Sequence, residues 1–297
     1  MIRMSAVFAL LATTASADPL TIVTDIAPVR SLVEAVAGTS AEVGVLLPPG
    51  ASPHDYAMRP SEARMLTNAD IVFWVGEGLT PFLEAPVESL AADATSVEFL
   101  HAEGWEPLPM RDFHDEEEGH DHHDHGDLDP HAWLSPDTLI AWAGIVADTL
   151  SATDPDNAET YRDNAAAFVT EVDAANAEAA ALLADLKDGK YVVSHDGFQY
   201  FEAAFDMPST GMIALSDASN PGAAHLAALK DRVAEEGVTC ILTDTQTNLG
   251  WAELVGEGQD VSFAVVDPLG AALPADGHQA TAIILDTANA LSACLKG

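Results

Sequence analysis

The sequence has few basic residues. Lys and Arg together number 11 among 297 residues, against 48 Asp and Glu, which gives a formal net charge of −37 at pH 7. Nucleic-acid binding needs clustered Lys and Arg, because these side chains displace counterions from the phosphates, so a nucleic-acid partner is excluded. The same charge repels anionic membrane surfaces and phosphorylated substrates, and it attracts cations.

The sequence also lacks long hydrophobic runs. Beyond residue 17, no apolar stretch reaches the roughly 18 residues of a membrane-spanning helix. The short apolar run Met4 to Ala12 follows Arg3 and precedes Ala15-Ser16-Ala17, a pattern typical of a secretory signal peptide. We therefore expect residues 1–17 to be a signal peptide removed on export; an N-terminal anchor helix is the alternative.

Cysteine is scarce, with Cys240 and Cys294 the two present. An even number of cysteines in an exported chain favours one disulfide, and two buried free thiols are the alternative. The sequence contains no G-x-S-x-G, P-loop or H-E-x-x-H motif, so the common signatures of serine hydrolases, nucleotide-binding proteins and zinc proteases are missing.

What is present is an alternation of apolar strand-like runs and helical stretches. The expected strands are 20–25, 42–47, 71–75, 96–100, 190–194, 211–215, 239–243 and 261–267. The expected helices are 28–37, 60–69, 81–91, 223–236, 249–256 and 278–295. Near-continuous apolar strands between helices predict an α/β fold, with mostly parallel sheets covered on both faces.

A long helical segment divides this pattern in two. No Gly or Pro interrupts residues 156–188, and apolar residues recur there at spacings of three and four. We interpret 154–188 as a spine helix that joins an N-terminal lobe, 18–153, to a C-terminal lobe, 189–297; an ordinary core helix is the alternative.

An acidic, histidine-rich segment interrupts the N-terminal lobe at 112–129. It contains nine acids and five histidines among its eighteen residues and almost nothing to bury, so we expect a mobile loop. Its histidines, which we predict to be a secondary, weaker metal site, are His114, His120, His122, His123 and His125. A solvated acidic loop without a role is the alternative.

Three other histidines lie in defined local contexts. His54 follows a Pro/Gly-rich turn after a strand, His131 follows the acidic loop, and His195 lies at the carboxyl end of a strand. Ligands of open α/β sheets bind outside the carboxyl ends of the strands, so each position suits a cleft. Two of the three precede the spine and one follows it, so a metal shared by them would bridge the lobes. A lone histidine is more often structural, which is the alternative for each.

The sequence also contains, in order, the motifs GASPHDY, MRPSEARMLTNADIVFWVG, the acidic histidine-rich loop, DPHAWLSP, VVSHDGFQYFEAAF and VVDPLG. Together they resemble the ZnuA-like, periplasmic zinc-binding components of ABC importers, over essentially the whole chain after residue 17. The resemblance implies two α/β lobes joined by one long helix, with the metal in the interlobe cleft. It implies that the protein passes Zn²⁺ to a membrane permease and catalyses no reaction.

The resemblance carries the ligand role to His54, His131 and His195. Manganese-binding relatives have a carboxylate where His195 stands, and three neutral imidazoles suit zinc better than manganese. The resemblance leaves the fourth position open between Asp267 and a water molecule. The cysteine pair also resembles the zinc branch.

Three other functions stay open at this point. A secreted zinc hydrolase could use three histidines and a water, although Asp55 is the one candidate base. A manganese or nickel importer component and a metal buffer or adhesin are the others. We expect a periplasmic monomer that binds zinc and an ABC permease and is not an enzyme.

Overall fold

The computed structural model describes residues 19–111 and 128–297. The predicted signal peptide and residues 112–127 of the acidic loop, with all five of its histidines, lie outside the described residues. Within the described part of the chain, no helix combines the length and apolar character needed to cross a membrane.

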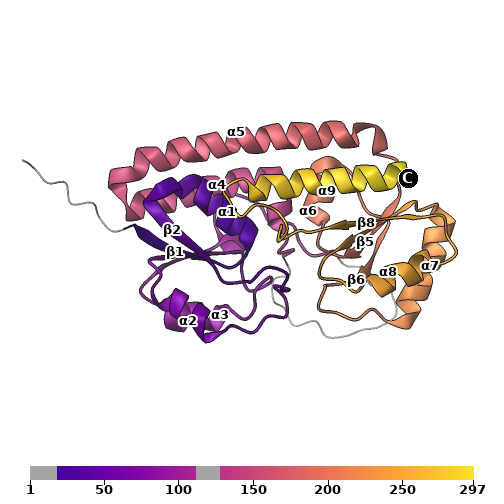
Figure 1. Cartoon of the computed structure of the whole chain (residues 1–297), viewed down its shortest axis with the longest axis horizontal. Coiled ribbons are helices and arrows are strands. Elements are labelled where there is room, and N and C mark those ends of the chain that lie inside the picture. The colour runs from indigo at the N-terminus through magenta and orange to yellow at the C-terminus, as the bar shows by residue number, and fades with distance from the viewer. Residues whose placement is uncertain (1–18, 112–127) are drawn as a thin grey trace, which may run out of the picture.

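The N-terminal lobe is built on four parallel strands in the order β2-β1-β3-β4. The strands are β1 (Leu20–Thr24), β2 (Ala41–Val45), β3 (Ile71–Trp74) and β4 (Thr95–Glu98). The helices of this lobe are α1 (Ala27–Ala37), α2 (Pro60–Thr67), α3 (Glu84–Leu90) and α4 (Pro136–Thr153), with single 3₁₀ turns η1 (Gly38–Ser40), η2 (Phe99–His101) and η3 (Ala132–Leu134). In Figure 1, α2 and α3 lie below the sheet, and α1 and α4 lie above it.

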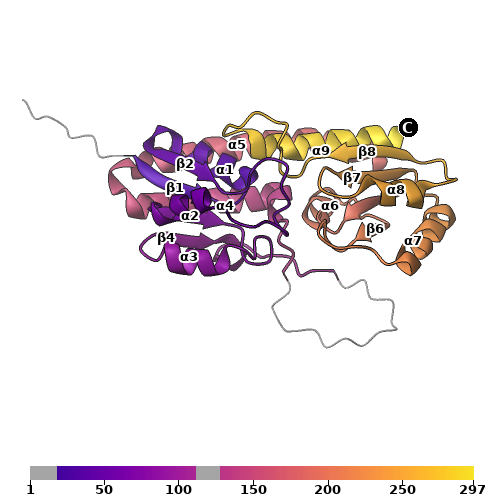
Figure 2. The same ribbon diagram turned by 60° about the horizontal axis from the view of Figure 1, so that its bottom comes forward.

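The C-terminal lobe repeats this arrangement with the order β6-β5-β7-β8, again all parallel. The strands are β5 (Tyr191–His195), β6 (Gly211–Ala214), β7 (Cys240–Asp244) and β8 (Ser262–Val266). The helices are α6 (Gln199–Phe205), α7 (Ala223–Glu236), α8 (Leu249–Gly256) and α9 (Gln279–Lys296). Figure 2 shows the two lobes next to each other, with α7 and α8 at the far end from α2 and α3. The predicted α/β fold with two parallel-sheet lobes is confirmed.

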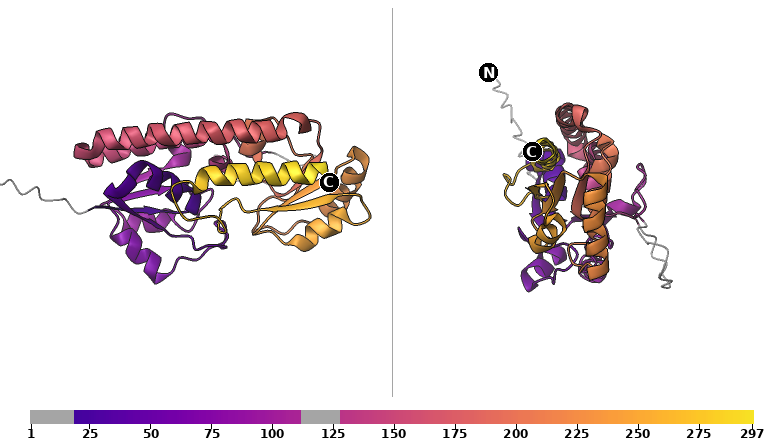
Figure 3. Two further views of the ribbon diagram at one scale, coloured as in Figure 1. Left: turned by 45° about the horizontal axis from the view of Figure 1, so that its top comes forward. Right: turned by 90° about the vertical axis from the view of Figure 1, so that its right-hand side faces the viewer.

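The predicted linking helix is α5 (Ala158–Leu183), which is preceded by the 3₁₀ turn η4 (Pro155–Asn157) and followed by η5 (Ala184–Leu186). At 1.5 Å per residue, its 26 residues extend about 39 Å, long enough to lie along both lobes. Its buried residues recur at spacings of three and four, from Tyr161 through Phe168 and Val172 to Leu183. A second helix, α9, runs beside α5, as both views of Figure 3 show.

The lobes also share one hydrophobic core. A single cluster of buried side chains includes Ile22 and Leu32 of the N-terminal lobe, Val172 of α5, and Leu242 and Ile284 of the C-terminal lobe. Helix α9 contacts α1 as well as β7 and β8. The two lobes are therefore held together by two helices and a continuous apolar interior.

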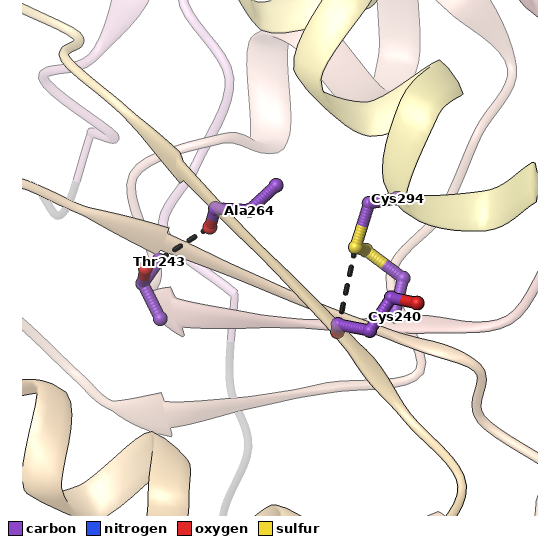
Figure 4. Close-up of a disulfide and its surroundings, with 5 residues drawn as sticks. Cys240, Thr243, Ala264 and Cys294 are labelled. Atoms are coloured by element: carbon purple, nitrogen blue, oxygen red, sulfur yellow. Dashed lines mark hydrogen bonds between the residues drawn. A yellow bond between two sulfur atoms is a disulfide. The ribbon is translucent and has the colours of Figure 1, made fainter. Parts of the chain in front are cut away.

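A disulfide between Cys240 of β7 and Cys294 of α9 attaches the second linking helix to the C-terminal sheet (Figure 4). The two Cα atoms are 5.5 Å apart. The Cys294 sulfur also lies 3.5 Å from the carbonyl oxygen of Ser262 on β8. The disulfide interpretation of the cysteine pair is thus confirmed, and the alternative of two free thiols is wrong.

All eight predicted strands are present, with ends that differ by one or two residues, and α7 and α8 have the predicted bounds. Two helices were not predicted, α4 and α6. The signal for α4 was available, because Ser135 accepts a hydrogen bond from the Thr138 N–H as its N-cap and Pro136 occupies the first turn. The spine helix ends before Gly189, since the backbone tightens into a 3₁₀ turn at Ala184.

Candidate metal centre

His54 lies in the loop that connects β2 to α2. The Ser52 hydroxyl oxygen accepts a hydrogen bond from the His54 N–H at 3.2 Å, which fixes the backbone beside the imidazole. The far end of this loop is held by Glu62, a buried residue of α2. Its carboxylate accepts hydrogen bonds from the Arg59 N–H at 2.5 Å and from the Tyr56 hydroxyl at 2.8 Å. Hydrogen bonds therefore fix the loop backbone both before and after His54.

His131 immediately precedes η3 and is oriented by Asp129. The Oδ1 atom of Asp129 accepts hydrogen bonds from the His131 N–H at 2.9 Å and from the ring Nδ1 at 2.8 Å. With the proton on Nδ1, the lone pair of His131 is on Nε2. Two residues later, Trp133 Nε1 donates to the carbonyl of Pro268 at 2.8 Å and connects this segment to the C-terminal lobe.

His195 ends β5, and its Nδ1 lies 2.7 Å from Oδ2 of Asp244, the last residue of the neighbouring strand β7. Asp244 is itself held by the hydroxyl of Ser194, by the Thr247 hydroxyl at 2.7 Å and by the Gln246 and Thr247 N–H groups at 2.8 Å. His195 and Asp244 are 3% and 1% exposed. This network holds the imidazole with Nδ1 protonated and the Nε2 lone pair available.

The structure brings the three predicted histidines together. Nε2 of His54 and Nε2 of His131 are 3.2 Å apart, and their ring centroids are 5.3 Å apart. The centroid of His131 is also 5.2 Å from that of His195. Two nitrogens bound to one tetrahedral zinc at 2.0–2.1 Å would be about 3.3 Å apart, which matches the first pair.

The third imidazole, that of His195, packs against Gly197. A Cβ atom added at Gly197 would lie 2.8 Å from Cε1 of His195 and closer still to Nε2, so a side chain larger than hydrogen at this position would displace the ring. Within residues 19–111 and 128–297, no three His, Cys, Asp or Glu side chains are grouped as closely as a metal site requires. His54 and His131 have the nitrogen spacing of two zinc ligands, and a three-histidine site would need His195 to come closer to them.

The electrostatic environments of the histidines differ. Burial, followed by the neighbouring His131 imidazole, lowers the pKa of His54 to about 3. Burial also lowers the pKa of His195, but the hydrogen bond and charge of Asp244 outweigh it, so this pKa is raised. The low pKa keeps His54 neutral, and the raised pKa of His195 reflects its hydrogen bond to Asp244.

A cavity of about 260 Å³ opens beside His54 and His131. Leu215 of the C-terminal lobe and Met110, next to the acidic loop, contribute to its lining. Just beyond Met110, Arg111 contacts two carboxylates of the C-terminal lobe, with its Nη1 2.5 Å from Glu202 and its Nε 2.8 Å from Asp196. Arg111, the last described residue before the acidic loop, is therefore attached to the C-terminal lobe beside His195.

Sequence reasoning overlooked the supporting carboxylates, Asp129, Asp196, Glu202 and Asp244. Asp129 was counted as part of the acidic loop, and Asp244 follows the last residue of a predicted strand. The strand ends gave a usable signal, since the carboxyl ends of neighbouring parallel strands meet at one edge of a sheet.

Asp267, the candidate fourth ligand, is engaged in its own loop. Its Oδ1 accepts hydrogen bonds from the N–H groups of Leu269 and Gly270 at 3.0 Å each, and its Oδ2 accepts one from Ala271 at 2.6 Å. These bonds are those of a residue that caps the turn after β8. A ligand role for Asp267 stays a prediction, as does the secondary metal site of the loop histidines outside the described residues.

Comparison with known proteins gives one consistent result. The model of the family "zinc-uptake complex component A periplasmic" (ZnuA) matches residues 22–294. The high-affinity zinc uptake system protein ZnuA of Paracoccus denitrificans is 34% identical, over 95% of this chain and 93% of that protein. A crystal structure of a ZnuA deletion mutant with zinc bound superposes with a TM-score of 0.77 at 26% identity, covering 92% of this chain and 98% of that one. The solute-binding protein FpvC of Pseudomonas aeruginosa, in complex with Mn²⁺, shares the fold with a TM-score of 0.81 at 20% identity, covering 94% and 99%.

Proposed function

Because this chain belongs to the ZnuA family of periplasmic zinc-uptake components, we propose that it captures Zn²⁺ between its lobes and delivers it to an ABC-transporter permease. The observation that carries the proposal is the 3.2 Å separation of Nε2 of His54 and Nε2 of His131, with the buried His195 imidazole next to them. Three neutral imidazoles from both lobes form a ligand set suited to zinc.

In the proposed site, His54 and His131 take the ion first, because their nitrogens already have the spacing of two zinc ligands. A small approach of the C-terminal lobe then brings His195 to the ion and completes the coordination. A water molecule takes the fourth position in preference to Asp267, since three backbone N–H groups already use that carboxylate. Captured this way, the ion links the two lobes.

The same observations weigh against a zinc hydrolase. Asp55, the base suggested by the sequence, is exposed, and the carboxylates nearest the ring nitrogens, Asp129 and Asp244, are hydrogen-bonded to Nδ1 of two histidines. Neither is free to act as a general base toward a zinc-bound water. We propose that the chain has no catalytic activity and acts as a periplasmic monomer, exported by the signal peptide at residues 1–17.

Manganese is the second candidate, because the fold is shared with a manganese-bound solute-binding protein. The ligand chemistry favours zinc, since manganese prefers carboxylate and water oxygens over a set of three imidazoles. Elemental analysis of the protein after exposure to equal zinc and manganese distinguishes the two, and a stoichiometric manganese content would contradict the proposal.

The ligand assignment is tested with His54→Ala, His131→Ala and His195→Ala, measured by competition with a chelator. Each variant should lose the tight zinc site, because a water molecule does not replace an imidazole held in place. His278→Ala is the matched control, since His278 is exposed and hydrogen-bonded to Glu171 on the spine helix. Wild-type affinity in all three ligand variants would show that zinc binds elsewhere.

A further inference from the structure

Two buried carboxylates lie directly behind the candidate zinc ligands, one on each side of the cleft. We propose that Asp129 and Asp244 are positioning residues for zinc capture, which select a divalent ion by balancing its charge and which present Nε2 of His131 and His195 to it. This inference rests on the proposed function, because it assumes that these two histidines bind the ion.

Among the described residues, the hydrogen-bond donors to the Asp129 carboxylate both belong to His131. Asp129 is 2% exposed, and its Oδ1 accepts both the N–H and the Nδ1–H of His131. Its Oδ2 is buried without a hydrogen-bond partner within the described residues. A buried oxygen of a charged group is unfavourable unless a positive charge is close, and an ion on Nε2 of His131 would supply one.

Asp244 supports His195 in the same way from the other lobe. It is 1% exposed, and its Oδ2 lies 2.7 Å from Nδ1 of His195. Its remaining partners, Ser194, Gln246 and Thr247, are neutral donors. This carboxylate therefore has no cationic partner among these contacts until the imidazole or an ion on it becomes positive.

The charges add up to a divalent ion. The three imidazoles bind metal in their neutral form and contribute no charge, whereas Asp129 and Asp244 contribute one negative charge each. A divalent ion balances the charge of these two carboxylates, and a monovalent or trivalent ion leaves one unit of charge unbalanced in a poorly solvated interior, where charges interact strongly. Of the three histidines, His131 and His195 are the ones paired with a carboxylate among the described residues.

Two asparagine variants separate charge from orientation. In Asp129→Asn, the retained Oδ1 still accepts both His131 donors, and the new amide NH₂ takes the place of the unpartnered Oδ2, so charge alone is lost. In Asp244→Asn, two backbone N–H groups hold the carbonyl oxygen, so the NH₂ faces Nδ1 of His195. The His195 proton then moves to Nε2, which blocks metal binding.

The matched control is Asp25→Asn. Asp25 is fully buried at the end of β1, and its carboxylate accepts the N–H groups of Ile26 and Val75, not a ring nitrogen. Chelator competition measures the Kd for zinc, thermal unfolding of the metal-free protein measures stability, and the visible spectrum of bound Co²⁺ reports the number of ligands.

We expect Asp129→Asn to weaken zinc binding about 10-fold and Asp244→Asn about 100-fold, the range for groups that support metal-bound histidines. Asp129→Asn should leave the melting temperature of the metal-free protein unchanged or higher, because an uncompensated charge is removed. The Co²⁺ spectrum should change in Asp244→Asn alone, and Asp25→Asn should bind zinc like the wild type.

The outcomes that overturn the inference are distinct from those that overturn the proposed function. If His131→Ala and His195→Ala lose zinc but both asparagine variants match Asp25→Asn, the ligands are right and the charge balance is wrong. If Asp129→Asn destabilises the metal-free protein without a change in Kd, its role is structural and the inference fails. If His131→Ala and His195→Ala bind zinc like the wild type, the proposed function itself fails.

Discussion

Gly197 is the position where a single methyl group tests the zinc site most directly. The His195 ring lies against this glycine, so a Cβ atom would be 2.8 Å from Cε1 and 3.0 Å from Cδ2 of the imidazole, and closer still to Nε2. The backbone of Gly197 does not have a positive φ, so alanine is not excluded by backbone strain. The effect of Gly197→Ala is therefore the displacement of one ring.

The size of that displacement follows from the contact distances. Ordinary van der Waals contact begins at 3.4 Å, so the imidazole must withdraw by at least about 0.6 Å from its present position. Metal–ligand distances tolerate deviations of about 0.2 Å, three times less. We expect Gly197→Ala to weaken zinc binding about 10-fold to 100-fold, comparable to the loss of a group that orients a metal-bound histidine.

The assay is chelator competition on Gly197→Ala, with Gly144→Ala as the matched control. Gly144 lies within α4, and nothing is within 4 Å of an added Cβ there, so alanine should keep wild-type zinc affinity and raise helix stability by up to about 1 kcal/mol. Equal zinc affinity in the two variants would refute the placement of His195 in the metal site.

Three further predictions address stability, protons and the acidic loop. Replacing Cys240 and Cys294 with serine should lower the free energy of unfolding by about 4 kcal/mol, because the disulfide joins two residues 54 positions apart in the sequence. Urea denaturation measures this change, and an unchanged midpoint would contradict it. Zinc affinity should fall as the pH drops from 7.5 to 5.5, because His195, whose pKa is raised, must release a proton to solvent before Nε2 can bind the metal. His54, with a pKa of about 3, stays neutral over this range; a flat titration profile would count against a histidine site. Deleting residues 112–127 should leave one tight zinc site and remove the additional, weaker zinc binding in calorimetry. The deletion should be tolerated, since the β-bridge between Pro109 and Leu128 already joins the chain on either side. Loss of the tight site would mean that the loop provides a primary ligand.

The fold was largely predictable, because its signals are local. The run Ile71–Trp74 is apolar at every position, and each residue is buried between two layers of helices. Helix α7 could be bounded because its apolar residues recur at helical spacing and Gly237, with φ 70°, ends it. Short α6 has only seven residues, too few for a helical period to stand out from the apolar strand that precedes it.

The site was predictable only in part. Each histidine stands beside a turn or a strand end, which can be seen in the sequence. The groups that orient them depend on which strands are neighbours. Asp244 reaches His195 because β7 lies beside β5, although 49 residues separate the two along the chain. A strand order other than β6-β5-β7-β8 would give the same local sequence and leave His195 without its carboxylate.

The restraint between the lobes determines how such a site can work. Helices α5 and α9 run along both lobes, a single core passes between them, and the disulfide attaches the end of α9 to β7. Large hinge opening would have to break this interior, whereas bringing His195 to the pair His54 and His131 needs only a small approach of the lobes. The energy of capture then comes from completing the coordination and not from burying new apolar surface. On this reasoning, the bound and metal-free forms should differ little in overall shape, and a decrease of many ångströms in the radius of gyration on zinc binding, measured by small-angle scattering, would contradict it.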